Sequence, residues 1–214
     1  MESTISGVGV IDKAMTIISV VERQKRSLAE LVTSTGFSRA TAHRLASALE
    51  AHGLLRKDND GRYVIGYRAI SLAQAVGEMS LAERALPALA ALRDSTGESA
   101  QLYVVEADTR VCIASLESPH GLRTIVRTGA VLPLGKGSGG RILDGSDPGP
   151  GGWLDSVAER ETGVASVSAP VIVGGDVVAA VSVSGPIERM STKPGNLHGV
   201  AVMRAATTIA AALT

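Results

Sequence analysis

Residues 27–53, SLAELVTSTGFSRATAHRLASALEAHG, predict two short helices separated by a tight turn. The Ser27 hydroxyl can accept a hydrogen bond from the first turn, and Glu30 follows three residues later, which is the spacing of a capping box. Gly36 ends this helix because glycine adopts the left-handed conformation at little cost. Ser38 then caps the second helix. The order indicates a helix-turn-helix motif.

The second helix, predicted between Ser38 and Gly53, has two different faces. The inner stripe is apolar and consists of Ala42, Leu45, Ala46 and Leu49. The outer face carries polar and cationic residues in its first turn and a half, namely Ser38, Arg39, Thr41, His43 and Arg44. A recognition helix presents such residues to base edges in the major groove. The alternative is a plain helical hairpin with a solvated charged face.

The stretch that follows, residues 54–66, predicts a β-hairpin. Two short runs flank the sequence DNDG at residues 58–61, whose residue types tolerate a positive φ. A hairpin directly after the second helix is a wing. Lys57 and Arg62 flank its tip, and we expect both to contact DNA phosphates.

Charge is distributed unevenly along the 214 residues, although the formal net charge is zero. Residues 1–68 carry ten Lys and Arg against seven Asp and Glu, and residues 69–214 carry eleven against fourteen. A basic front part on an acidic remainder suits a nucleic-acid reader joined to a second domain. Neither a signal peptide nor an apolar run of membrane length is apparent, which predicts a cytoplasmic protein without a membrane partner.

Cys112 is the single cysteine, which excludes an internal disulfide. Its apolar surroundings, RVCIAS, predict a buried thiol. The four histidines, His43, His52, His120 and His198, are scattered and show no metal-ligand spacing with Cys112. We therefore predict neither a metal nor a cofactor.

Three further helices are predicted in the first half of the chain. Residues 8–23 place Val10, Ala14, Ile17, Ile18 and Val21 on one face, and the surplus apolar surface suggests dimerisation. Residues 67–77 predict a linker helix ended by Gly77. Residues 80–97 repeat Leu81, Leu86, Leu89 and Leu92 at helical spacing, with Pro87 predicting a kink or a later start.

From residue 98 the periodicity becomes that of strands. Strands are predicted at residues 98–108, 109–118, 122–129, 164–173 and 176–185, with a glycine-rich loop and short helix near 132–143 and a closing helix at 192–213. Strands mixed with flanking helices predict an α+β fold. The predicted domains are 1–66, a linker helix at 67–79, and 80–214.

The chain resembles the IclR family of bacterial transcriptional regulators over nearly its whole length. The residues that carry the resemblance are SLAEL, SRATAHRL, GESAQLY, the LPL and SGGRIL pieces of 132–143, ERETGVASVSAPV and AAVSVSGP. The pieces GVASVSAPV and VSVSGPIER are most similar to the NdgR/LtbR-type members, which are tied to amino-acid and notably leucine biosynthesis.

The resemblance implies a winged helix-turn-helix domain that binds double-stranded operator DNA, and a GAF-like effector-binding domain. It also implies a homodimer or a dimer of dimers. By motif, Ser138 and Gly139 stand in the effector-binding loop, and Ser166 stands where many members have cysteine. Ser182 and Ser184 stand in the strand facing the pocket. The chain departs from the family at 144–152, DGSDPGPGG, where members usually have a further helical segment.

The segment 135–140, GKGSGG, matches the spacing of a dinucleotide-binding loop, but no β-α-β pattern follows it. The P-loop spacing also fails. Free N–H groups at a helix N-terminus attract an anion, so a ligand carboxylate would suit this loop. A tight structural turn is the alternative.

The predicted effector is a small carboxylate, either a branched-chain amino acid or the related oxo acid. Ser166, Ser182 and Ser184 could each donate to it, or could bond to neighbouring backbone. Asp155, Glu159 or Glu161 could pair with a ligand ammonium, or form a solvated surface. Two alternative classes are an enzyme, for which no G-x-S-x-G is present, and a ligand-binding module without DNA contact. The basic second helix favours a sequence-specific regulator.

Overall fold

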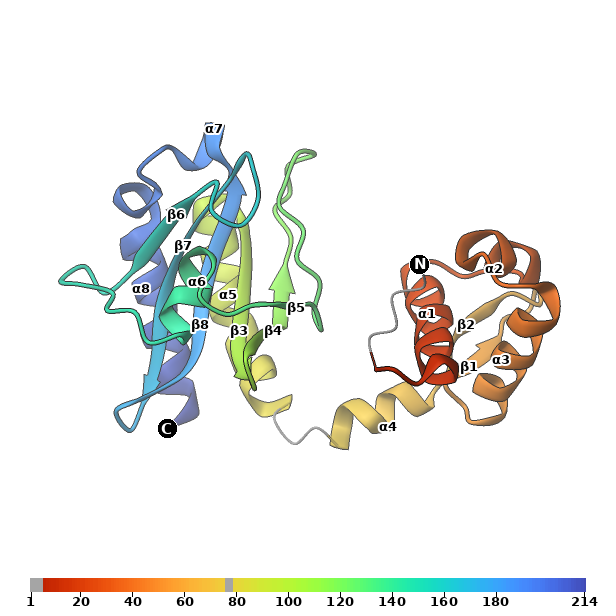
Figure 1. Cartoon of the computed structure of the whole chain (residues 1–214). Coiled ribbons are helices and arrows are strands. Elements are labelled where there is room, and N and C mark those ends of the chain that lie inside the picture. Colours follow the sequence, from red (N-terminus) through yellow and green to blue (C-terminus); the bar gives the residue numbers. More distant parts are fainter. Residues whose placement is uncertain (1–5, 76–78) are drawn as a thin grey trace. The chain divides into compact units, whose positions relative to one another are not determined.

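The computed structural model describes residues 6–75 and 79–214 (Figure 1). The chain forms two compact units, Met1–Met79 and Ser80–Thr214, and each is described by itself. The end of the predicted linker helix at Gly77 lies outside the described residues. The predicted boundaries at residues 66 and 79 stay predictions.

The first unit contains three helices, a hairpin and a fourth helix. In chain order they are α1 (Gly9–Arg23), α2 (Leu28–Thr35), α3 (Arg39–Ala51), β1 (Leu55–Lys57), β2 (Tyr63–Ile65) and α4 (Arg68–Ala75). Its core joins residues from every element except α4, with Ile17, Leu31, Leu45, Leu55 and Tyr63 among the buried side chains. The whole predicted inner stripe of α3 is buried. This arrangement confirms a winged helix-turn-helix.

Local capping signals fix the ends of α2 and α3. The backbone N–H of Glu30 donates to Ser27 Oγ at 3.3 Å, and that of Ser27 donates to Glu30 Oε2 at 2.7 Å, so the predicted capping box is confirmed. Gly36 ends α2 with φ of 72°. The N–H of Thr41 donates to Ser38 Oγ at 3.2 Å, which confirms the cap of α3.

The wing pairs β1 with β2 in antiparallel register, with Lys57 opposite Tyr63. The hairpin returns directly onto the end of α3 at Gly66. A Cβ atom on Gly66 would lie 2.0 Å from the carbonyl oxygen of Gly53, so this close approach admits only glycine. The predicted hairpin is confirmed.

The apolar face predicted for α1 is only partly buried. Ile17 and Val21 are buried in the core, whereas Val10 is 59% exposed. Ile11 and Met15 are also more than half exposed. Val10 is exposed because the first half of α1 extends beyond the core that α2 and α3 offer, so the face keeps the surplus apolar surface that the sequence indicates.

The second unit is built on one antiparallel sheet of six strands in the order β5-β4-β3-β8-β7-β6. The strands are β3 (Ser99–Glu106), β4 (Thr109–Leu116), β5 (Val131–Pro133), β6 (Leu154–Val157), β7 (Val164–Val173) and β8 (Asp176–Pro186). Helices α5 (Met79–Thr96) and α8 (Pro194–Leu213) cover one face (Figure 1). The short helix α6 (Gly137–Leu143) lies on the other face, and α7 (Ile187–Met190) follows β8.

The predicted strand at residues 122–129 is wrong. Thr124 and Val126 are buried in alternation, which produced the strand pattern, but the segment does not pair along a neighbouring strand. Pairing with β4 begins only at its end, where Gly129 N–H donates to Cys112 O at 2.7 Å and Cys112 N–H donates to Ala130 O at 3.0 Å. The edge strand is therefore β5.

Other predicted elements of this unit need smaller corrections. Strand β6 was missed because its charged neighbourhood resembled a surface loop, and α7 was missed because it has only four residues. Helix α5 is continuous through Pro87, and Leu86 is 42% exposed instead of facing the core. The closing helix starts at Pro194, two residues later than predicted.

The remaining elements of the predicted α+β fold are confirmed, including β3, β4, β7 and β8. Within 6–75 and 79–214, no helix is both long and apolar enough to cross a membrane.

Candidate functional site

Two places in the structure carry the predicted site residues: the outer face of α3 with its wing, and the face of the sheet that α6 covers. On α3, Arg39, His43 and Arg44 are exposed. Their side chains make no hydrogen bond or ion pair with any residue that the structure describes. Ser38 and Thr41 are instead engaged with each other, because Ser38 Oγ donates to Thr41 Oγ1 at 3.0 Å while capping the helix.

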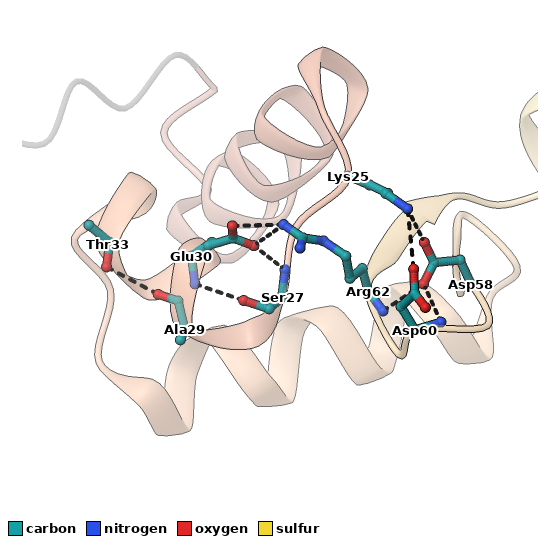
Figure 2. A network of polar contacts seen from close by, with 8 residues as sticks. All are labelled: Lys25, Ser27, Ala29, Glu30, Thr33, Asp58, Asp60 and Arg62. Carbon is teal, nitrogen blue, oxygen red and sulfur yellow. Dashed lines mark hydrogen bonds and ion pairs between the residues drawn. The ribbon is translucent and has the colours of Figure 1, made fainter.

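Two cations of the wing, Lys57 and Arg62, are in contrast paired with carboxylates of the same unit, whereas the third, Arg56, lies 4.9 Å from the centre of the Tyr67 ring. Figure 2 shows Arg62 Nη2 against both carboxylate oxygens of Glu30, at 2.7 Å each. The Lys25 ammonium lies 3.0 Å from Asp58 and 3.5 Å from Asp60 at the hairpin tip. These pairs tie the wing to α2 and to the chain just before it.

Lys57 is held less firmly than Arg62. Its ammonium lies 3.6 Å from Glu50 on α3 and 5.3 Å from the centre of the Tyr63 ring. Long, exposed ion pairs of this kind contribute little and are screened by salt. Of the two paired cations, Lys57 is thus more easily released to a phosphate than Arg62.

The hydrogen bonds of this network perturb its ionisable groups. The N–H of Ser27 and the Arg62 guanidinium hold the pKa of Glu30 below its usual value. The backbone N–H of Arg62 and the Lys25 ammonium do the same for Asp58, and Asp58 raises the pKa of Lys25. All three shifts favour the charged forms of Glu30, Asp58 and Lys25.

The face of the sheet under α6 is lined by serines because successive side chains of a strand alternate between faces. In β7, Ser166 and Ser168 face α6, whereas Ala165 and Val167 join the core against α8. Ser166 pairs across the sheet with Ser184 of β8 and with Ser156 of β6, and Ser168 pairs with Ser182.

These hydroxyls bond to one another in a continuous chain. Ser138 Oγ of α6 lies 2.7 Å from Ser166 Oγ and 2.8 Å from Ser168 Oγ. Ser156 Oγ lies 2.9 Å from Ser166 Oγ, and Ser168 donates to Ser182 Oγ at 2.9 Å. Of the five predicted effector residues, Ser138, Ser166 and Ser182 are members of this chain.

The direction of donation along this chain of serine hydroxyls follows from the number of hydrogens available. A hydroxyl has a single hydrogen to donate. Ser182 donates its hydrogen to the carbonyl of Val167 at 3.3 Å, and Ser168 donates to Ser182. Ser138 must then donate to Ser168, because the hydrogen of Ser168 is already used. By the same reasoning Ser166 donates to Ser138, and Ser156 donates to Ser166. Each of the five hydroxyls offers lone pairs to the surroundings but no free hydrogen.

Ser184 and Gly139 complete the predicted set. Ser184 Oγ donates to Gln101 Oε1 at 3.1 Å, so its hydrogen is also used. Gly139 lies in α6, where a Cβ atom would approach Arg110 Nη1 and Ser168 Oγ to 3.2 Å each. The N–H of Ser138 at the start of α6 donates to Ser156 Oγ, which occupies one of the donors predicted to hold an anion.

A small cavity lies between α6 and the serine face. Its lining includes Tyr103, Arg110, Arg160, Val164, Gly137 and Gly139, together with Ser156, Ser166, Ser182 and Ser184. Its volume is about 20 Å³, which is room for the centre of about one water molecule. A ligand larger than water must therefore open it. Four of the five predicted effector residues line this cavity, and Ser138 lies behind them.

Two family models match the chain. The model for the IclR helix-turn-helix domain matches residues 10–59, and the model for the C-terminal domain of the bacterial transcriptional regulator IclR matches residues 73–147. Together they cover more than half of the sequence. The chain belongs to the IclR family of transcriptional regulators.

Relatives and solved structures match most of the chain. The glycerol operon regulatory protein of Streptomyces griseus is 24% identical, covering 84% of this chain and 85% of its own. The IclR structure of Thermotoga maritima is 20% identical with a TM-score of 0.72, covering 96% and 98% of the two chains. An IclR homolog from Microbacterium hydrocarbonoxydans, complexed with 4-hydroxybenzoate, is 21% identical with a TM-score of 0.71, covering 95% and 98%.

These relatives are regulators and not enzymes, so the enzyme alternative is set aside. This IclR-family chain is a DNA-binding transcriptional regulator with a C-terminal effector-binding domain. The match to the C-terminal model ends within 144–152, the segment in which the sequence lacks a helix and the structure has turns.

Sequence reasoning missed part of this IclR-type cavity. Arg110 and Tyr103 were not selected, because each lies in an apolar strand pattern that predicts only core. The i, i+2 spacing of Ser166 and Ser168 could have identified Ser168. The predicted ammonium partners lie elsewhere: Asp155 accepts from the N–H of Gly195, Glu159 lies 3.5 Å from Arg141, and Glu161 is exposed beside Arg160.

Proposed function

We propose that this IclR-family regulator reads a specific operator through α3, with Arg39, His43 and Arg44 reaching base edges. The observation that carries the proposal is that these exposed side chains of the first turn and a half have no partner within the described residues. Arginine is the side chain best suited to bidentate recognition of guanine in the major groove. Ser38 and Thr41 hold the helix start and lie close to the backbone of the bound DNA.

Phosphate contacts come from the wing in this proposal. Lys57 can exchange its long pair with Glu50 for a phosphate. Arg62 contributes by fastening the hairpin to α2 through Glu30, which sets the position of the wing tip.

The second unit binds a small carboxylate-bearing effector in the cavity under α6, which Gly139, Ser166, Ser182 and Ser184 line, with Ser138 supporting the serine chain. The structural relative complexed with 4-hydroxybenzoate supports a carboxylate-bearing ligand for this fold. The GVASVSAPV and VSVSGPIER segments favour control of amino-acid biosynthesis genes of the leucine type, with a branched-chain amino acid or its oxo acid as effector. Effector binding shifts the protein between two DNA affinities.

The active form in this proposal is a homodimer or a dimer of dimers. Its support is the apolar surface that α1 leaves exposed, made by Val8, Val10, Ile11 and Met15. Several large apolar side chains exposed within two helical turns are typical of an interaction site. A dimer of dimers would require a second contact surface between copies of the chain.

The experiment that tests the function is footprinting of upstream DNA, followed by gel shifts with operator and scrambled duplexes. A panel of amino acids and 2-oxo acids is added to each. We expect tighter binding to the operator than to scrambled DNA, and a change in that affinity with one member of the panel. Equal affinity for both duplexes would support a ligand-binding module without sequence-specific DNA contact.

A further inference from the structure

The cavity of the second unit contains a buried cation that makes no hydrogen bond or ion pair with the described residues. Arg110 is 3% exposed and extends from β4 into the cavity, where its guanidinium carbon lies 4.9 Å from the centre of the Tyr103 ring. Its side chain makes no hydrogen bond or ion pair within 6–75 and 79–214, and its buried Nε has no acceptor there. Removing a charge from water without a partner is costly, so such a group usually has a function.

The glycines of α6 are placed to make room for this guanidinium. A Cβ atom on Gly140 would lie 2.9 Å from Arg110 Nη1, and one on Gly139 would lie 3.2 Å from it. Gly137, with φ of 71°, would bring a Cβ within 3.6 Å of Nη2. The GKGSGG segment therefore accommodates an arginine that comes from another element.

The other charges facing the cavity do not compensate Arg110. Arg160 is a second guanidinium in the lining, and its own carboxylate, Glu161, is 3.8 Å away and exposed. Burial lowers the pKa of Arg110 most and Arg160 lowers it further, whereas the carboxylate of Glu159, which lies 3.5 Å from Arg141, raises it. Neither Asp nor Glu is among the residues that line the cavity. The cavity therefore carries net positive charge.

The geometry points to Arg110 as the residue that binds the carboxylate of the effector, and to an effector that carries no ammonium group. This inference rests on the proposed effector-binding function and narrows its ligand class to acids such as 2-oxo or 2-hydroxy acids. A guanidinium pairs with a carboxylate through two parallel N–H···O bonds. The serine hydroxyls cannot take that role, because their hydrogens are already donated within the chain or to Gln101.

The exclusion of amino acids follows from the same charges. An α-ammonium would be placed beside two guanidiniums with no carboxylate in the lining to balance it. A 2-oxo group presents only acceptors, which suit Arg110 and Arg160. A 2-hydroxy group can in addition donate to a serine lone pair.

The test is calorimetric titration of the full-length protein with matched acids: pyruvate against alanine, and 2-oxoisocaproate against leucine, with acetate as the smallest probe. Equal concentrations of chloride control for ionic strength. We expect at least one oxo acid to bind, and its amino acid to bind at least about tenfold more weakly. Equal binding of the two members of each pair would overturn the ligand class.

Variants of Arg110 then test the residue. Arg110→Met keeps most of the volume and should weaken oxo-acid binding by a factor on the order of 10 to 100, the usual value of a charged hydrogen bond. Its ligand-free melting temperature should not fall, because the guanidinium has no hydrogen bond to lose. Arg110→Lys should be intermediate. The matched control is Arg127→Gln, an exposed arginine outside the cavity, which should bind like the wild type.

A second variant acts without touching Arg110. Gly140→Ala adds one methyl group that displaces the guanidinium, and should also lower affinity, whereas Gly121→Ala, with open space around its Cβ, should not. Oxo-acid binding that survives in both Arg110→Met and Gly140→Ala would overturn the assignment and leave the proposed effector function standing. A wild type that binds none of the five probes would overturn the anion site, and operator binding in the same preparation would show that the DNA-binding function is separate.

Discussion

Lys57 and Arg62 of the wing should respond differently to salt, although sequence alone predicts phosphate contacts for both. Lys57 is half exposed and weakly paired, whereas Arg62 is bound through Nη2 to both oxygens of Glu30. Each phosphate contact contributes about 0.9 to the slope of log affinity against log salt concentration. Between about 50 and 200 mM salt, one contact therefore changes affinity by about 3.5-fold.

The assay is fluorescence anisotropy with a duplex of arbitrary sequence, repeated across that salt range. Lys57→Gln should reduce the magnitude of the slope by about one unit. Arg62→Gln should leave the slope near that of the wild type, because Arg62 remains on Glu30 when DNA binds. Any loss of affinity in this variant should then be equal at all salt concentrations.

Glu30→Gln provides the sharpest comparison. Glutamine still accepts the N–H of Ser27 and so preserves the capping box, but it no longer holds the guanidinium. Arg62 is then free, and the slope should steepen by up to about one unit. Equal reductions for the Lys57 and Arg62 variants, with no change in Glu30→Gln, would show that the ion pair opens on DNA and would refute this reasoning.

Three further predictions follow from the same structure. Arg44→Ala should cost about 1–3 kcal/mol on operator DNA and less on scrambled DNA, as measured by gel shift; equal losses would mean that Arg44 contacts phosphate. Burial raises the pKa of Cys112 to about 12, so the native thiol should resist a thiol reagent near neutral pH until the protein is unfolded, and rapid native labelling would contradict its burial. The pKa values of Glu30 and Asp58 are lowered in the folded protein, so their charged forms stabilise the first unit at pH values above the ordinary pKa of each group. This stability should be lost as the pH falls through the lowered pKa values. Circular dichroism during acid titration should show a weaker pH dependence in Glu30→Gln, and an unchanged one would remove Glu30 from the cause.

Signals that depend on neighbours in sequence predicted the structure well. The capping box of Ser27 and Glu30 and the αL position of Gly36 are both fixed within one helical turn, so the residues themselves determine them. The inner stripe of α3 could be predicted equally well, because its apolar residues recur with the period of a helix. These local features were sufficient to identify the helix-turn-helix and its wing.

Features that depend on distant partners were predicted poorly. The alternation of Thr124 and Val126 matches a strand, yet whether a strand forms depends on the backbone of a neighbour, and β4 is reached only at Gly129. The apolar face of α1 was predicted correctly as apolar, but the extent of the core decides which of its residues are buried. Partner positions of this kind are properties of the tertiary fold.

The glycine-rich segment 135–140 shows why the sequence could propose an effector site there but could not explain it. Glycines in this spacing are compatible with a phosphate loop, an anion-binding helix start and a tight turn, and the sequence alone does not distinguish these three structures. The structure adds that a Cβ on Gly139 or Gly140 would meet the guanidinium of Arg110, a residue some thirty positions earlier on β4. Arg110 thus requires glycine at positions 139 and 140, although its own place in the sequence indicates only a core strand. Arg110 and the glycines become a candidate ligand site only when the fold brings them together.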